Sequence, residues 1–261
     1  MFNKLIAMVM LFTFSFCNSM EIERKDSIHP ALTIVYWSDY ACPYCYIGEK
    51  RLESALDELG VKEHVEIEMK AFELDPSTGR EVQSRTDERF AKKYGLTLEG
   101  ARAQIEQISN LGRAEGIDFK YAETQYTNML DAHRLTKFVA SKGKDVAKIT
   151  HLLFDAYFTK NLKLAERSVL ISLAKEVGID ESDVNTMLDS QDFVDEVRSD
   201  EADAQRIGIH GVPFFIINNK YKISGAWPKI EIKRKLSQAL SDQQSDALSG
   251  MVCGLDGCHR K

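Results

Sequence analysis

Two cysteines spaced three residues apart are the side chains in this sequence best suited to chemistry. They lie in the tetrad Cys42-Pro43-Tyr44-Cys45, which follows a short apolar run at residues 32–37 and precedes a leucine-rich pattern with helical spacing. The apolar run predicts a buried strand, and the later pattern predicts a helix. Pro43 suits the first turn of that helix, because the N–H that it lacks has no partner there. The tetrad is therefore predicted to lie at a helix N-terminus.

That position predicts thiol chemistry. Unpaired N–H groups and the positive end of the helix dipole stabilise a thiolate, which makes Cys42 the predicted nucleophile. Cys45, one helical turn later, is placed to attack a mixed disulfide formed at Cys42. A structural disulfide or half of a zinc site uses the same spacing. The strand before the tetrad, the proline within it and the helix after it favour redox function.

The first 19 residues have the layout of a signal peptide. Lys4 precedes a largely apolar run at residues 5–16, and small polar residues follow. Twelve apolar residues span about 18 Å as a helix, well short of a hydrocarbon core of about 30 Å, so no membrane span is predicted. We expect export to a periplasm or the exterior, with residues 1–19 removed. A buried N-terminal helix and lipidation at Cys17 are the alternatives, and the bulky Phe16 disfavours lipidation.

The composition excludes several classes of protein. The chain has 261 residues, of which 44% are hydrophobic and 28% charged, so it is predicted to be globular and long enough for one large or two modest domains. Five cysteines are too few for a scaffold built on disulfides. The net charge of -6 gives no electrostatic basis for binding nucleic acid. The cysteines are therefore expected to have specific roles.

The prolines divide the chain into regions of different periodicity, because residues 77–212 contain none. Outside that stretch, strands are predicted at 32–37 and 65–72, and a hairpin at 214–224 turns at Asn218-Asn219. Inside it, apolar residues repeat with helical spacing. The predicted helices there are 96–115, 131–141, 146–159, 167–177 and 184–207. Two β-regions therefore bracket a helical insertion.

This order of elements, with Gly211-Val212-Pro213 opening the hairpin, resembles the DsbA-like branch of the thioredoxin superfamily over nearly all of the chain after residue 19. Finer matches resemble its FrnE-like subgroup, which neighbours the 2-hydroxychromene-2-carboxylate isomerases and kappa-class glutathione transferases. The matching segments are Ser38-Asp39, Asp131-Ala132-His133-Arg134-Leu135, 153–158 and 204–208. In the isomerases and transferases the catalytic position is typically serine and the second cysteine is absent. The pair Cys42 and Cys45 therefore favours disulfide exchange.

The resemblance implies an α/β thioredoxin fold interrupted by an all-helical insertion domain. The two halves of the thioredoxin fold would be residues 20–78 and 205–242, the insertion 79–204, and a tail 243–261. The resemblance also implies that Val212-Pro213 is a cis bond facing the tetrad. The backbone of Val212 is then expected to pair with an extended substrate beside Cys42.

The tail holds a second pair, Cys253 and Cys258. Tails with this C-x4-C spacing are a feature of FrnE-like proteins, so the resemblance implies a second redox pair that exchanges with Cys42 and Cys45. The polar segment 241–250 is expected to act as a flexible tether for that exchange. A fixed disulfide is the alternative, and a zinc site with His259 is disfavoured by its spacing and by the lack of a fourth ligand.

The predicted function is a thiol-disulfide oxidoreductase, acting as an oxidase or isomerase on protein thiols and disulfides. No metal or organic cofactor is expected, and glutathione or a redox partner protein is the expected electron partner. Tyr44, His133 and His210 are candidate cleft residues, although packed or solvated histidines are the alternative. A glutathione-dependent isomerase or transferase of the kappa-class type and a chaperone-like binding module are the alternative functions.

Overall fold

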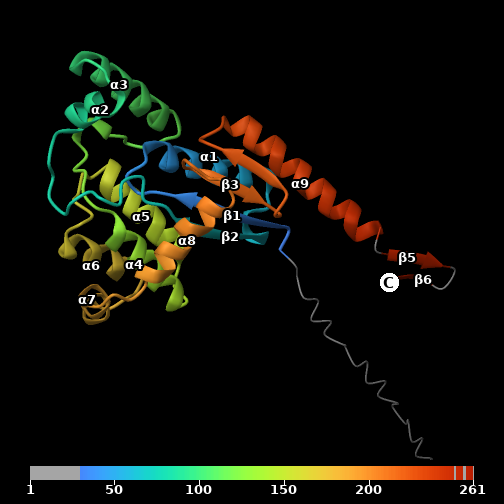
Figure 1. Ribbon diagram of the computed structural model, residues 1–261. Helices are drawn as coiled ribbons and strands as arrows, with labels where there is room; N and C mark the ends of the chain where they lie inside the picture. Colours follow the sequence, from blue (N-terminus) through green and yellow to red (C-terminus); the bar gives the residue numbers. More distant parts are fainter. Residues whose placement is uncertain (1–29, 250, 255–256, 261) are drawn as a thin grey trace, which may run out of the picture.

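A four-stranded sheet forms the centre of the computed structural model, which describes residues 30–249, 251–254 and 257–260 (Figure 1). The strand order is β2-β1-β3-β4, with β1 parallel to β2 and antiparallel to β3, and with β3 antiparallel to β4. The strands are β1 (Leu32–Ser38), β2 (Val65–Ala71), β3 (Phe214–Ile217) and β4 (Tyr221–Ser224). Each predicted strand is therefore present, and the α/β class of the fold is confirmed.

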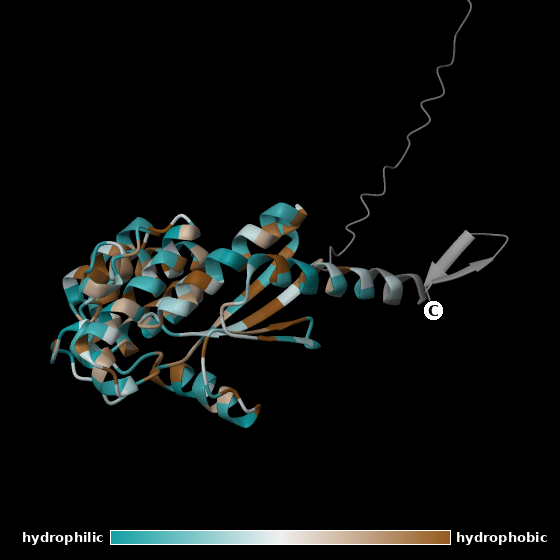
Figure 2. Cartoon of the chain, turned by 90° about the horizontal axis from the view of Figure 1, so that it is seen from above, coloured by the Kyte–Doolittle hydropathy of each residue, from teal (hydrophilic) through white to brown (hydrophobic). Residues whose placement is uncertain are grey.

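Helices cover both faces of the sheet, which explains why the sequence of β1 is almost entirely apolar. Tyr36 faces α1 (Pro43–Leu59) and α9 (Lys229–Ser249) in the main core. Trp37 faces the opposite side, where it packs with Ala204 of α8 (Val194–Arg206), and its indole N–H donates to the carbonyl of Asp200 at 2.9 Å. Figure 2 shows the strands as largely hydrophobic and the helices as mixed in hydropathy.

The chain between β2 and β3 is helical. Its helices are α2 (Thr86–Tyr94), α3 (Leu98–Ala114), α4 (Leu130–Ser141), α5 (Val146–Phe158), α6 (Arg167–Glu176), α7 (Glu181–Asp189) and α8, with a short 3-10 helix at Tyr121–Glu123. Another 3-10 helix, Lys62–His64, lies directly before β2. Helices α3 to α6 begin and end within two residues of the predicted bounds. Helix α2 was not predicted, and it packs with α3 at one end of the molecule (Figure 1).

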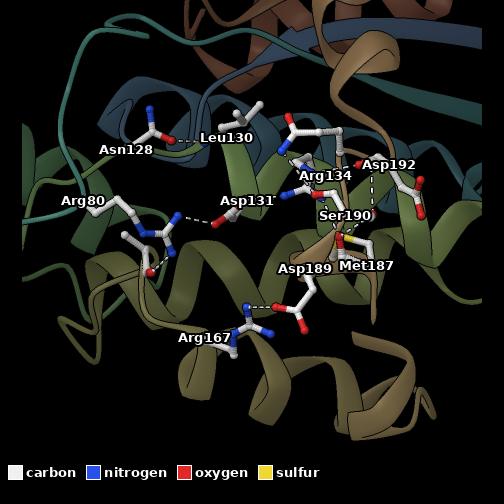
Figure 3. Close-up of polar contacts among 12 residues, drawn as sticks. Arg80, Asn128, Leu130, Asp131, Arg134, Arg167, Met187, Asp189, Ser190 and Asp192 are labelled. Atoms are coloured by element: carbon white, nitrogen blue, oxygen red, sulfur yellow. Dashed lines mark hydrogen bonds and ion pairs between the residues drawn. The ribbon is translucent and has the colours of Figure 1, made fainter. Parts of the chain in front are cut away.

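The prediction of one helix over 184–207 is wrong, because the chain breaks into α7 and α8. Phe193, just before α8, has the left-handed φ of 65°. The guanidinium of Arg134, from α4, holds the break in place (Figure 3). It donates to the carbonyls of Met187, Ser190 and Asp192 at 2.5, 2.8 and 2.8 Å. These bonds tie the last turn of α7 and the residues after it to α4, and the partner lies too far along the chain for periodicity to show it.

The prediction of a flexible tether at 241–250 is also wrong, because α9 continues to Ser249. The side chain of Gln243 donates to the carbonyl of Pro30 at 3.1 Å, and Pro30 precedes β1 at the end of the sheet opposite Cys42. Beyond α9 lies a hairpin, β5 (Met251–Gly254) with β6 (Gly257–Arg260), in which Cys253 lies opposite Cys258. Figure 1 shows this hairpin at the far end of α9.

Two further predictions concern the domain boundaries and the signal peptide. The boundaries expected at 204/205 and 242/243 fall inside α8 and α9, not between elements. The expected signal peptide, residues 1–19, and Cys17 lie outside the described residues. Within the described part of the chain, no helix combines the length and apolar character needed to cross a membrane.

Candidate active site

The tetrad lies at the N-terminus of α1, as the sequence predicts. Cys42 is the N-cap residue in an extended conformation, with φ -91° and ψ 113°, and Pro43 is the first helical residue. The amide of Cys45 donates to the carbonyl of Cys42 at 3.1 Å, which begins the first turn. Both side chains are buried, with 4% of Cys42 and 1% of Cys45 exposed, and they are not bonded to each other. The first turn of α1 thus holds two adjacent thiols.

Cys42 faces the loop that leads into β3. Its thiol donates to the carbonyl of Val212 at 3.5 Å, and the peptide bond between Val212 and Pro213 is cis. Gly48 of α1 allows this close approach, because a Cβ there would lie 3.0 Å from Cγ of Pro213. The structure therefore brings together Cys42, Val212 and Pro213, which lie about 170 residues apart in the chain.

Cys45 faces the interior. The backbone N–H of Asp39 donates to its sulfur at 3.5 Å. Burial, followed by the neighbouring Cys42 thiol, raises the pKa of Cys45 well above its ordinary value. Cys45 is therefore protonated at neutral pH and lies in the interior behind Cys42.

Asp39 fixes the turn between β1 and α1. One carboxylate oxygen accepts from the amide of Ala41 at 2.9 Å, and the other accepts from the amide of Leu74 at 2.7 Å. The ring of His133 lies beside it, with Nε2 3.9 Å from Oδ1 of Asp39. Asp39 and His133 are each 1% exposed. The sequence singles out Asp39 only through the resemblance, because its role depends on Leu74, which a helix and a strand separate from it.

The other predicted cleft residues differ in their positions. Tyr44 is 42% exposed and lines the cleft beside Cys42. His133 lies behind the tetrad and does not line that cleft, and His210 is exposed outside it. His133 therefore has the packed role that the sequence leaves open as the alternative.

The cleft beside Cys42 has a volume of about 320 Å³. Its walls come from the tetrad, from Leu74, from the insertion and from the loop before Pro213. The insertion contributes two cationic side chains and several aromatic ones. The cationic ones are Arg89 and Lys93 of α2, and the aromatic ones are Phe90 and Tyr94 of α2 with Tyr121 and Tyr126. Gln104 and Ile108 of α3 complete this wall. The sequence missed the residues of α2 together with the helix itself, and a short amphipathic pattern before Gly95 is the feature that indicates it.

A half-buried acid lies on the other side of the helix. Glu49 of α1 accepts a hydrogen bond from the hydroxyl of Tyr36 at 3.2 Å, and its second oxygen is buried without a partner among the described residues. Burial raises the pKa of Glu49 to about 8. With Tyr36, Tyr46 and Met69 it lines a cavity of about 130 Å³. The sequence analysis assigned Glu49 no role.

The fold and the site together define a class. A Cys-x-x-Cys pair at the N-terminus of the helix after a central strand, opposite the X-Pro loop that opens a later strand, is the site of a thioredoxin fold. Residues 33–237 match the family model described as a DSBA-like thioredoxin domain. The chain belongs to this family, whose members include thiol-disulfide oxidoreductases.

Individual relatives agree with this assignment. An uncharacterized protein of Bacillus subtilis, YwbO, is 26% identical over 215 residues, covering 81% of this chain and 96% of the relative. The crystal structure of a probable DsbA oxidoreductase from Streptomyces coelicolor has a TM-score of 0.76 and 28% identity, over 88% of this chain and 99% of the other. A 2-hydroxychromene-2-carboxylate isomerase has a TM-score of 0.62 at 14% identity, over 82% and 98% of the two chains. This last likeness concerns the fold alone.

Proposed function

We propose that this protein catalyses disulfide exchange with protein thiols and disulfides, with Cys42 as the nucleophile and Cys45 as the resolving cysteine. The observation that carries the proposal is the asymmetry of the pair. Cys42 opens onto the cleft beside the carbonyl of Val212, whereas Cys45 is enclosed and its pKa is raised by burial. A thiol at a helix N-terminus that lines a cleft reacts first, and a thiol one turn away that lies outside the cleft reacts second.

Each step of the proposed exchange balances in sulfur bonds and protons. The Cys42 thiolate attacks one sulfur of the substrate disulfide, so that a Cys42–substrate disulfide forms and the other substrate sulfur leaves as a thiolate. Cys45 then loses its proton to solvent, from which the released substrate thiolate takes up a proton, and the Cys45 thiolate attacks the sulfur of Cys42. The Cys42–Cys45 disulfide closes, and the remaining substrate sulfur leaves. The protein is oxidised by two electrons, the substrate is reduced by two, and the same steps run in reverse when the substrate is oxidised.

The loop opposite Cys42 supplies the proposed binding site for the substrate backbone. The carbonyl of Val212 lies 3.5 Å from the sulfur of Cys42, at the start of β3. An extended segment placed there pairs with Val212 as a short added strand, which holds its sulfur against Cys42. Pro213 lacks an N–H and is redox-inert, so it leaves the sulfur free to react. No metal or organic cofactor takes part in this proposal.

The second pair has a different proposed role. Cys253 and Cys258 face each other across the β5–β6 hairpin, and facing residues of this kind have Cα atoms about 4.5–5.5 Å apart, within the range for a disulfide. We propose that they form a second redox pair that exchanges with glutathione or a partner protein. Helix α9 leads away from Cys42, so direct exchange with Cys42 in the same chain is not proposed. The proposed location is the periplasm or the exterior.

The test is to measure the reduction of insulin and the oxidation of a reduced, unfolded protein side by side, together with the potential of the Cys42–Cys45 couple in glutathione buffers. Disulfide exchange predicts activity in at least one direction, with both cysteines required. Glutathione-dependent isomerisation or transfer that continues at full rate in Cys45→Ser would instead assign the protein to the isomerase or transferase activity. Protection of client proteins without either cysteine would assign it to the binding modules.

A further inference from the structure

Arg89, which lines the cleft beside Cys42, has an unusual electrostatic position. Every other arginine between residues 30 and 249 lies within 4.0 Å of a carboxylate oxygen. The Arg89 guanidinium makes no ion pair with the described part of the chain, its Nε and Nη2 atoms are buried there without a hydrogen-bond partner, and the Tyr121 hydroxyl is its polar neighbour. Arg89 as a whole is half-buried. Because a partly buried charge without an anionic partner is costly, the guanidinium is available to an anion that the described chain does not supply.

The guanidinium of Arg89 packs against an aromatic ring. It stacks over the ring of Tyr126, with 3.8 Å between the guanidinium carbon and the ring centroid. Burial raises the pKa of Tyr121, the charge of Arg89 acts in the opposite direction, and Cys42 adds to the rise. Tyr121 therefore interacts electrostatically with both Arg89 and Cys42, and all three residues line the same cleft. This arrangement places a fixed positive charge in the neighbourhood of the nucleophile.

A second cation lies on the same side of α2. Lys93 follows Arg89 by one helical turn, so the two side chains share a face, and both line the cleft. No ion pair of Lys93 is present among the described residues, and the cleft is lined by no aspartate or glutamate. The chain as a whole carries a charge of -6. A cationic, acid-free cleft in an acidic protein attracts anionic groups to Cys42.

We propose that Arg89 and Lys93 form a carboxylate-binding subsite that selects thiols and disulfides with a carboxylate close to the reacting sulfur. Such a carboxylate is supplied either by an acidic side chain beside a cysteine in a polypeptide or by a low-molecular-weight thiol. Guanidinium and carboxylate form charge-assisted hydrogen bonds, which are stronger than neutral ones. The subsite rests on the proposed exchange at Cys42 and defines which substrates that exchange favours.

The test compares rate constants for disulfides that differ in charge. Reduced protein is mixed with glutathione disulfide, which is anionic, with neutral bis(2-hydroxyethyl) disulfide and with cationic cystamine. Two disulfide-linked peptides, with glutamate or lysine next to the cysteine, form the polypeptide arm. We expect the anionic member to react fastest in at least one arm, and the arm in which it does so identifies the source of the carboxylate. Added salt should reduce this preference.

Variants locate the preference on α2. Arg89→Gln should lower the ratio of anionic to neutral rate about tenfold, which is the usual scale for loss of a charged hydrogen bond. Lys93→Gln should lower it less, and Arg89→Lys should restore part of it. Lys92→Gln is the matched control, because Lys92 is the neighbouring lysine on α2 but lies outside this cleft. Its ratio should equal that of the unmodified protein.

The outcomes distinguish failure of the proposed disulfide exchange from failure of the proposed carboxylate-binding subsite. If the unmodified protein does not react even with the neutral disulfide, the proposed exchange itself is wrong. If it reacts but shows no preference for anionic disulfides in either arm, the subsite is wrong. If Arg89→Gln does not fold, Lys93→Gln and the salt dependence of the unmodified protein decide the question. A preference that persists unchanged in Lys93→Gln and at high salt would then overturn the proposal.

Discussion

The two cysteine pairs of this chain occupy opposite kinds of surroundings. Cys42 and Cys45 lie at the junction of the central sheet, α1 and the helical insertion, and both are almost completely buried. Cys253 and Cys258 lie opposite each other in a two-stranded hairpin at the end of α9. Helix α9 is attached near Pro30, at the end of the sheet opposite Cys42. The pairs therefore sit at opposite ends of the sheet.

The difference shows that reactivity depends more on surroundings than on spacing. The first pair has a helix N-terminus, a carbonyl partner for the outer sulfur and an amide donor for the inner one. These features place the two sulfurs in different surroundings, and this asymmetry is the basis for proposing Cys42 as the attacker and Cys45 as the resolver. For the second pair, the backbone establishes only that the residues face each other. The following predictions test that contrast, from the largest expected effect to the smallest.

Removing the outer thiol should have the largest effect. Cys42→Ser is expected to lower the rate of insulin reduction by about a thousandfold or more, because a hydroxyl is a far poorer nucleophile than a thiolate at neutral pH. The rate is measured by the turbidity of the released insulin chain. A double Cys253→Ser, Cys258→Ser variant is the control and should remain active. Comparable losses in both variants would show that the two pairs act together.

Removing the support of the first pair should lower stability. Asp39→Ala leaves the amides of Ala41 and Leu74 without their acceptor, and each buried unpaired group costs about 1–3 kcal/mol. We expect the free energy of unfolding, measured in urea, to fall by about 2–5 kcal/mol. Asp39→Asn keeps one carbonyl acceptor and should lose less. Equal stability of Asp39→Ala and the unmodified protein would mean that this turn does not depend on the carboxylate.

Glu49 should make stability depend on pH. Its pKa is raised to about 8 in the folded state, above the value of about 4.3 expected in the unfolded chain. The folded state therefore binds more protons, so the stability from this group is complete below pH 4.3 and is lost as the pH rises through 8. We expect the free energy of unfolding to fall by a few kcal/mol across that range, since each tenfold difference in proton affinity is about 1.4 kcal/mol.

Glu49→Gln should remove this pH dependence and make the protein more stable than the unmodified form at pH 9. Urea titrations at several pH values measure the effect, and the exposed Glu63→Gln serves as the control. A fall in stability that is the same in both variants would assign the pH dependence to other groups.

The smallest effect is expected at the tail. The Cys253→Ser, Cys258→Ser variant should reduce small disulfides at a rate within about twofold of the unmodified protein, because α9 holds the hairpin far from Cys42. Stopped-flow fluorescence measures this single-turnover rate. A change of tenfold or more would show that the second pair takes part in the first reaction, and the contrast between the pairs would need revision.

Much of the fold could be predicted because local patterns determine it. The strand before the tetrad, the proline at the helix start and four helices of the insertion follow from periodicity and from residues with fixed backbone preferences. The helical extension of α9 was also visible, since residues 229–249 contain neither glycine nor proline. The polar composition of 241–250 does not by itself distinguish a tether from a helix. Polar residues form a surface helix as readily as a tether.

Other features depend on contacts between distant segments. The break between α7 and α8 is held by Arg134, and the turn before the tetrad is held to Leu74 by Asp39. The importance of Arg89 depends on the lack of an acid in the cleft beside Cys42, although Asp75 and Glu88 line a neighbouring hollow with Arg89, and no linear pattern records this arrangement. The cysteine pair was therefore predictable, whereas the lining of the cleft beside it was not.

The most direct test of the contrast is to identify the mixed disulfide by mass spectrometry. Reduced unmodified protein, Cys42→Ser and Cys45→Ser are each mixed with a peptide disulfide and quenched with acid. Cys45→Ser should accumulate a one-to-one adduct at Cys42, Cys42→Ser should form almost none, and the unmodified protein should release both peptides. An adduct at Cys45 in Cys42→Ser, or full turnover by Cys45→Ser, would contradict the assignment of Cys42 as attacker and Cys45 as resolver.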